Sequence, residues 1–171
     1  MKVSLSGGHG VGKTTSVFEL ATKYKKETKN KSVTVLTENA SHSPLPINKG
    51  TTKYSQYWIF CDQLRREIEL ETKYDIIICD RTIVDPIAYT SVSLPHEVEF
   101  IQSMKDFALH YLSTYDQIIF KKIETNDYHF NDGIRDYKDK SYRKQVEDKL
   151  LEIYDELYTK KPELRERFII S

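Results

Sequence analysis

A chain of 171 residues, with 39% hydrophobic and 30% charged residues, is long enough for one domain with a substantial core. Lys and Arg together number 26, as do Asp and Glu, so the net charge is zero. A neutral chain argues against general electrostatic binding to nucleic acid or to an anionic membrane surface. The sequence has no signal-peptide pattern and no apolar run long enough to span a membrane. Cys61 and Cys79 fit neither a disulfide framework nor the spacing of zinc ligands. We therefore expect a cytoplasmic protein with two buried thiols.

The first element and the loop after it carry the clearest motif of the chain. Residues 2–6 predict a short strand, and residues 7–14 then match G-x-x-x-x-G-K-T without a mismatch. Glycines permit the torsions in which backbone N–H groups cradle phosphate oxygens, and a helix over 15–25 would point its positive end at the same phosphates. Lys13 would reach the β- and γ-phosphates, and the Thr14 hydroxyl would bind Mg²⁺. The sequence therefore predicts a site for ATP and Mg²⁺, with contacts from Gly8, His9, Gly10, Val11, Gly12, Lys13, Thr14 and Thr15.

Strand-like and helix-like segments alternate along the rest of the chain. Further strands are expected at 33–36, 75–79, 117–120 and 168–170, and helices around 57–68, 96–111 and 146–157. The stretch 41–50 contains two prolines and is expected to be a loop. Apolar residues at helical spacing mark the core face of the helix around 57–68: Tyr57, Phe60, Cys61, Leu64 and Ile68. This alternation predicts a single α/β domain over residues 1–171, with a five-stranded parallel sheet in a three-layer α/β/α arrangement. Together with the glycine loop, this arrangement resembles the P-loop NTPase fold.

Asp80 directly follows the apolar strand at 75–79. Because ligands of parallel sheets bind at the carboxyl ends of the strands, Asp80 is expected near the phosphate loop, where its carboxylate would hold Mg²⁺ opposite Thr14. Arg81 comes next, and its planar guanidinium suits contact with phosphate oxygens. The alternative for both side chains is a solvated strand end.

Glu38 follows the second strand and is expected on the same rim of the sheet. A carboxylate near bound phosphates repels them unless it has a task of its own. It could activate a substrate hydroxyl for attack on the γ-phosphate, or bind a water of the Mg²⁺ shell. An exposed strand-end glutamate is the third interpretation.

A polar stretch after the fourth strand leads into several cations. Arg135 stands first among them and is followed by others before the last helix: Lys138, Lys140, Arg143 and Lys144. In a phosphoryl-transfer enzyme, a lid-like segment around 125–145 would exclude water and add positive charge, with Arg135 as its best single candidate. The alternative is a solvated helix face, because acidic residues dilute this charge: Asp136, Asp139, Glu147 and Asp148.

Taken together, these features resemble the nucleoside and nucleotide kinases among the P-loop proteins, over most of the chain. Deoxynucleoside kinases and thymidylate kinases carry a similar acidic-Arg-hydroxyl trio, here Asp80, Arg81 and Thr82, in which the arginine binds phosphate. The resemblance implies that Glu38 is the base that activates the substrate hydroxyl, although Asn39 stands where deoxynucleoside kinases usually have proline.

The same resemblance implies a nucleobase-reading glutamine on the following helix. Gln56 lies near the matching place, with Arg65 further along, and Gln63 is also available. The segments 80–89 and 132–135 also resemble a family of small AAA-type P-loop proteins that is similar to the nicotinamide riboside kinase domain.

The resemblance implies Mg-ATP-dependent phosphoryl transfer to a small acceptor, a nucleoside or a nucleoside monophosphate. Its catalytic residues would be Lys13, Glu38, Arg81 and Arg135, and its substrate contacts Glu38, Gln56, Arg65 and Arg81. A nucleotide-dependent switch or regulatory ATPase is one alternative, and a polynucleotide 5′-hydroxyl kinase is another, although the neutral charge makes a nucleic-acid partner the weaker reading. No membrane partner is expected, and kinases of this shape are often homodimers.

Overall fold

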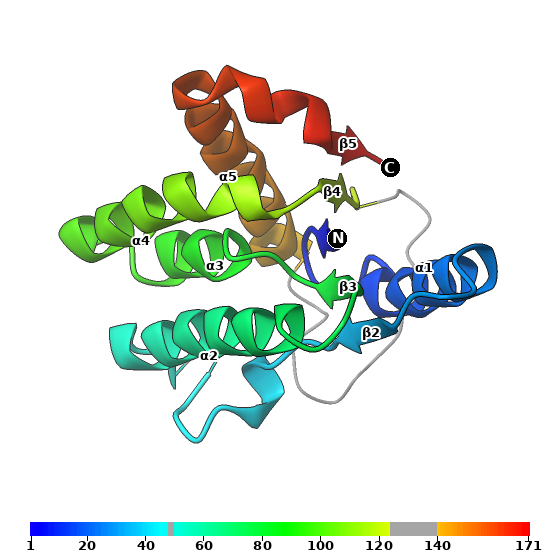
Figure 1. Ribbon diagram of the computed structural model, residues 1–171. Helices are drawn as coiled ribbons and strands as arrows, with labels where there is room; N and C mark the ends of the chain where they lie inside the picture. Colours follow the sequence, from blue (N-terminus) through cyan, green and yellow to red (C-terminus); the bar gives the residue numbers. More distant parts are fainter. Residues whose placement is uncertain (48–49, 124–139) are drawn as a thin grey trace.

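The computed structural model describes residues 1–47, 50–123 and 140–171. Within these residues, five parallel strands form one sheet in the order β2-β3-β1-β4-β5 (Figure 1). The strands are β1 (Lys2–Ser6), β2 (Val33–Leu36), β3 (Ile76–Asp80), β4 (Gln117–Phe120) and β5 (Phe168–Ile170). Four of the expected strands are found with the predicted bounds, and the fifth, β3, is shifted by one residue so that it includes Asp80.

Helices cover both faces of this sheet (Figure 1). They are α1 (Lys13–Glu27), α2 (Lys53–Glu71), α3 (Asp85–Ser93), α4 (Val98–Tyr111) and α5 (Lys140–Lys160), with short 3-10 turns η1 (Ala40–His42), η3 (Leu112–Thr114) and η4 (Pro162–Arg167). Helix α1 lies on one face and α2 to α5 lie on the other. The predicted three-layer α/β/α arrangement is therefore confirmed.

The pleat of the strands explains why apolar side chains pack on both faces of the sheet. In β1 and β3 alternate side chains point to opposite faces, so Val3, Leu5 and Ile78 pack against Val17 of α1. Ile77 and Cys79 face the other side, below α2. Both strands are buried along their whole length, as expected for the centre of a parallel sheet.

The larger core lies between β4 and the helices α3 to α5. Its members are buried apolar side chains from all four elements, among them Ile87, Met104, Phe120 and Leu150.

Within the described residues, no helix has both the length and the apolar character needed to cross a bilayer.

Helix α3 is the element that the sequence did not predict. Its sequence is rich in β-branched residues, with Pro86 in the first turn, and most of it is buried, so it shows no amphipathic period. Helix α3 connects the end of β3 to α4 and carries several side chains of the site described below.

The buried face of α2 agrees with the predicted one only at Phe60, which is buried, and at Leu64, which packs against the larger core. Cys61 is exposed rather than buried, and Tyr57 and Ile68 are exposed as well, whereas Cys79 is buried as expected. The helix instead turns Gln56, Gln63 and other side chains inward, and the whole buried set is Ser55, Gln56, Ile59, Phe60, Gln63 and Glu67. Polar residues on the inner face of a helix indicate that they have partners or a ligand there.

Candidate active site

The loop between β1 and α1 has the backbone that its glycines predict. Gly7, Gly10 and Gly12 have φ values of 141°, 73° and 74°, a region that side chains with a Cβ rarely adopt. A Cβ on Gly7 would also collide with the backbone carbonyl of Lys121. Helix α1 begins directly after Gly12, so its positive end faces the concave side of the loop.

Two side chains at the start of α1 contact the loop and the end of β3. The Lys13 ammonium is buried and donates a hydrogen bond to the Gly8 carbonyl, within the loop. The Thr14 hydroxyl donates to the Asp80 carboxylate over 2.5 Å. These two oxygen groups suit Mg²⁺, which prefers oxygen ligands and completes its shell with phosphate and water.

Register explains how Asp80 reaches the loop. Leu5 is paired with Asp80 between β1 and β3, so the carboxyl end of β3 lies beside the start of the phosphate loop. Because the ends of β1 and β3 lie side by side, Asp80 can contact Thr14, as the sequence predicts.

Arg81 lies between the loop and the neighbouring pocket. Its backbone has a φ of 106°, in the left-handed half of the map where side chains other than glycine are strained. The backbone N–H of Arg81 donates to the backbone carbonyl of Leu5 over 2.9 Å, and the Arg81 guanidinium donates to the backbone carbonyl of Gly7 over 3.0 Å. The strained turn thus directs the guanidinium back over the phosphate loop.

The guanidinium of Arg81 keeps its charge although it is buried. Burial lowers the pKa, but interactions with Tyr89, Glu38 and Asp85 outweigh that effect, so the pKa lies well above the ordinary arginine value. The guanidinium carbon also lies 5.2 Å from the centroid of the Tyr89 ring. A permanently charged group at this position can attract phosphate oxygens.

Asp85 is a site residue that the sequence analysis missed. Its fully buried carboxylate accepts hydrogen bonds from the Ser6 hydroxyl at 2.9 Å and from the Thr82 N–H and hydroxyl at 2.9 and 2.8 Å, and it pairs with Arg81 at 3.1 Å. It therefore ties the start of the phosphate loop to the end of β3. The signal for it was the Asp-Pro pair just after the trio, since Pro86 favours the first turn of a helix.

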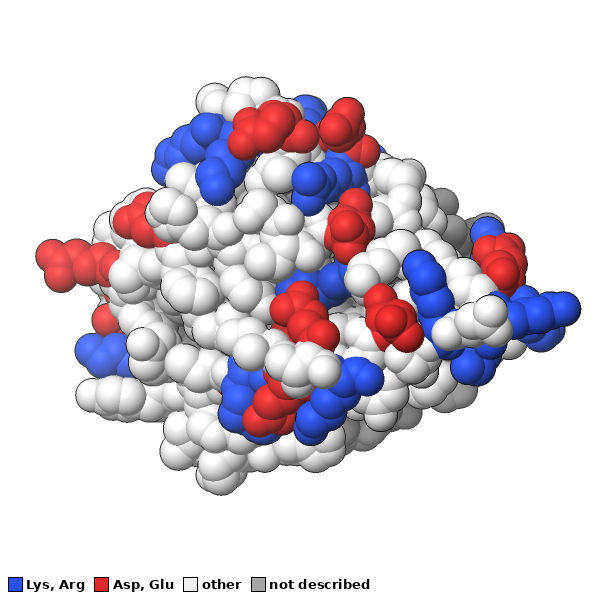
Figure 2. Space-filling model, viewed as in Figure 1, with Lys and Arg blue, Asp and Glu red and all other residues white. Residues whose placement is uncertain are grey.

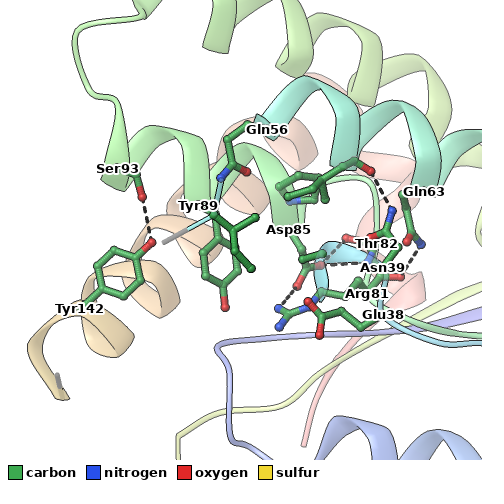
Figure 3. Close-up of a pocket in the computed structure, with 14 residues that line it drawn as sticks. Glu38, Asn39, Gln56, Gln63, Arg81, Thr82, Asp85, Tyr89, Ser93 and Tyr142 are labelled. Atoms are coloured by element: carbon green, nitrogen blue, oxygen red, sulfur yellow. Dashed lines mark hydrogen bonds and ion pairs between the residues drawn. The ribbon is translucent and has the colours of Figure 1, made fainter. Parts of the chain in front are cut away.

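A pocket opens beside Arg81, between the strand ends and helices α2, α3 and α5. Its polar lining includes Glu38, Gln56, Gln63, Arg81, Thr82 and Asp85. Figure 3 shows these side chains converging from separate elements, with Glu38 near the Arg81 guanidinium. The expected neighbours Glu38, Gln56 and Arg81 thus line one pocket, and Gln63, the second glutamine considered, lines it too.

The remaining expected residues lie elsewhere or outside the described residues. Arg65 is exposed on α2, where it pairs with Asp62 at 2.8 Å and with Glu69 at 2.7 Å, and it does not line the pocket. Arg135 and Lys138 fall in 124–139, outside the described residues.

The described end of the expected lid forms the first turns of α5. Lys144 is exposed and pairs with Asp148 at 2.5 Å, as expected of a solvated helix face. Arg143 is buried instead, and its carbonyl is within 3.7 Å of where a Cβ on Gly8 would lie. The start of α5 therefore lies close to the phosphate loop.

Comparison with known proteins agrees with this fold. The chain is similar in structure to a thymidylate kinase from Ehrlichia chaffeensis, with a TM-score of 0.63 and 20% identity over 99% of this chain and 85% of that one. It is also similar to a deoxyadenosine kinase from M. mycoides with bound dATP, with a TM-score of 0.62 and 16% identity over 100% and 90% of the two chains. At such identities the likeness concerns the fold.

Sequence comparison gives the family. No curated protein matches the chain. A family model described as an AAA domain matches residues 2–167, almost the whole sequence. With this match over almost the whole sequence, the chain belongs to the AAA domain family.

Proposed function

We propose that this protein transfers the γ-phosphoryl group of Mg-ATP to a hydroxyl or phosphate oxygen of a nucleoside or nucleoside monophosphate. The observation that carries this proposal is the position of Arg81. Its guanidinium contacts the Gly7 carbonyl of the phosphate loop and also lines the neighbouring pocket. A triphosphate on the loop and an acceptor in the pocket would therefore meet at one fixed positive charge.

The donor side of the reaction falls to the loop and the strand ends. Backbone N–H groups of residues 8–15 would hold the phosphates, and Lys13 would turn from the Gly8 carbonyl to the β- and γ-phosphates. Thr14 and Asp80 would hold Mg²⁺, which neutralises charge on the phosphate oxygens.

The acceptor side falls to Glu38 and the pocket. For a hydroxyl acceptor, the hydroxyl oxygen attacks the γ-phosphorus and its proton passes to the Glu38 carboxylate. The bond between the γ-phosphorus and the oxygen that bridges the β- and γ-phosphates breaks, and ADP is released. Arg81 would stabilise the charge on the transferred group, and Gln56 and Gln63 would contact the acceptor. Arg135 belongs to the proposal through its sequence position alone, as a further positive charge.

A polynucleotide acceptor has less support. Figure 2 shows Lys, Arg, Asp and Glu side chains interspersed on the visible face, and the whole chain has no net charge. Binding along a nucleic-acid backbone requires a continuous positive surface.

The test is acceptor-dependent turnover. The protein is incubated with Mg-ATP and a panel of nucleosides, nucleoside monophosphates and 5′-hydroxyl oligonucleotides, and ADP release is followed. ADP release stimulated by a nucleoside or its monophosphate supports the proposal. Stimulation by oligonucleotides alone would indicate a polynucleotide kinase, and binding of ATP without any stimulation would indicate a switch or ATPase, so either result contradicts it.

A further inference from the structure

The residue that follows Glu38 is fastened to helix α2. Asn39 is 2% exposed, and its side-chain nitrogen donates to the Ile59 carbonyl over 3.1 Å and to the Asp62 carboxylate over 2.9 Å. Both acceptors belong to α2, so both hydrogens of this amide are used on that helix.

The carboxylate of Asp62 is itself held in place. Its other oxygen accepts from the Arg65 guanidinium at 2.8 Å. Burial raises the pKa of Asp62, but the hydrogen bonds from Arg65 and Asn39 outweigh burial, so the pKa lies below the ordinary aspartate value. Asn39 therefore donates to a charged acceptor, and hydrogen bonds of this kind are stronger than those between neutral groups.

The residue that precedes Glu38 is fastened to the same helix. The Arg66 guanidinium donates to the Thr37 carbonyl over 3.0 Å. Asp62 and Arg66 are four residues apart on α2, so they lie one turn apart on the same face of the helix. Together, the contacts of Asn39 and Arg66 form a clamp that holds the backbone on both sides of Glu38.

The side chain inside this clamp faces the pocket. Glu38 and Asn39 both line the pocket, and Figure 3 shows Glu38 near the Arg81 guanidinium. The turn continues into η1, where the Asn39 carbonyl accepts from the backbone N–H of His42 over 2.9 Å. The place of the Glu38 carboxylate in the pocket thus depends on where α2 holds the residues next to it.

We propose that Asn39 and Arg66 are positioning residues, which clamp the turn at Glu38 onto α2 and so hold the Glu38 carboxylate at the acceptor hydroxyl. This inference rests on the proposed function, in which Glu38 takes the proton of that hydroxyl. A displacement of about 1 Å can cost on the order of a hundredfold in rate, so a loosened clamp should lower kcat. Binding of ATP, which falls to the loop after β1, should not change.

The kinetic experiment compares Asn39→Ala with a matched control. Gln102→Ala also removes a side-chain amide, but one that is exposed on α4 and donates to Asp106 over 2.8 Å. With the acceptor found in the panel, Asn39→Ala should lower kcat by about tenfold or more and leave the Kd of ATP within about twofold. Gln102→Ala should leave both quantities unchanged.

A double-mutant cycle with Glu38→Gln separates positioning from a general loss of order. If Asn39 acts through the Glu38 carboxylate, Asn39→Ala should lower kcat by no more than about twofold once that carboxylate is absent. Arg66→Met keeps the apolar stem of the side chain and loses its donors. It should give the same pattern, and it covers the case in which Asn39→Ala fails to fold. A wild-type kcat in Asn39→Ala, or its full effect repeated in the Glu38→Gln background, would overturn the inference.

Hydrogen exchange without any ligand distinguishes failure of this inference from failure of the proposed function. The backbone N–H groups of His42 and Ser43 donate to the carbonyls of Asn39 and Ala40 over 2.9 and 3.2 Å, so their exchange reports the order of the turn. Exchange at both should be about tenfold faster or more in Asn39→Ala than in the wild type, and unchanged in Gln102→Ala. Equal exchange in Asn39→Ala and the wild type would overturn the clamp even if turnover is found. Faster exchange in Asn39→Ala, with no acceptor-dependent turnover in the wild type, would overturn the proposed function and not the clamp.

Discussion

Arg81 combines three properties that rarely occur in one residue. It is buried, it is charged, and its backbone lies at a φ of 106°. Its contacts with Leu5, Gly7 and Asp85 hold that backbone in place. Strain of this kind persists only where the surroundings over-determine it, which is common at functional sites.

Glu38 is the residue whose role a single substitution decides. If it takes the proton of an acceptor hydroxyl, Glu38→Gln should lower kcat by about 10²- to 10⁴-fold while ATP still binds. Steady-state kinetics with the acceptor found in the panel would measure this.

Glu69→Gln is the matched control, because Glu69 pairs with exposed Arg65 outside the pocket. It should leave kcat unchanged. A change of only a few-fold in Glu38→Gln would instead assign Glu38 to the Mg²⁺ shell or to the surface.

Local motifs predicted the contacts around the glycine loop better than those of the neighbouring pocket. The pairing of Thr14 with Asp80 could be predicted because the ends of adjacent parallel strands meet at one edge. The burial of Asp85 and the contact of Asn39 with α2 could not, since both depend on contacts between elements distant in sequence.

At the scale of elements, strands were predicted more closely than helices. The strands are short apolar runs whose ends are marked by polar residues or turns. Helix α3 has no amphipathic period because most of it is buried, so hydrophobic spacing missed it. Hydrophobic spacing predicted α2 as a helix but gave only part of its buried face, because α2 turns polar residues inward.

The turn between β1 and α1 depends on Gly7. Gly7→Ala should destabilise the fold by about 1–3 kcal/mol through its backbone torsion alone, and more through collision with the Lys121 carbonyl. Thermal unfolding would show a lower Tm for this variant.

Gly8→Ala provides the comparison for stability. A Cβ there would meet the Arg143 carbonyl at 3.7 Å and Ile123 at 3.8 Å, ordinary contact distances. Its Tm should stay close to that of the wild type. An equal decrease in Tm in both variants would mean that the loop tolerates no Cβ at either position, whatever the backbone torsion of the residue.

At the scale of the whole molecule, the Lys2–Glu67 pair joins β1 to α2. Removing one partner leaves an uncompensated buried charge, so Lys2→Met should lower the free energy of unfolding by about 3–5 kcal/mol. The double variant Lys2→Met/Glu67→Gln should recover most of that loss, because neither charge remains. Urea denaturation of the three proteins would test this, and a double variant as unstable as the single one would contradict it.

The same cluster makes the free energy of unfolding depend on pH in the alkaline range. Burial lowers the pKa of Lys2, but attraction to Glu67 and the hydrogen bond with Glu71 outweigh it, so the pKa lies above the ordinary lysine value. Burial raises the pKa of Tyr115 well above its ordinary value, and the charge of Glu67 adds to this. The native state thus keeps protons that the unfolded chain releases above about pH 10.

The contribution of these groups to the free energy of unfolding should therefore be constant from neutral pH to about pH 10 and fall as the pH rises beyond it. Urea denaturation across this range measures the slope. The double variant at Lys2 and Glu67 should show a shallower slope, because the contribution of Lys2 is gone while the buried Tyr115 hydroxyl and Cys79 thiol, whose pKa values burial raises, still contribute. A level profile in the wild type would contradict these pKa directions.

The most direct test of the central claim follows the phosphoryl group itself. The protein is given Mg²⁺ and ATP labelled in the γ-phosphate, together with the acceptor that stimulates ADP release, and the products are separated. The label should appear on the nucleoside or nucleotide in an amount equal to the ADP formed, and Lys13→Ala should abolish the transfer. Label found only in inorganic phosphate would show hydrolysis rather than transfer, and would contradict the assignment of this site as a kinase.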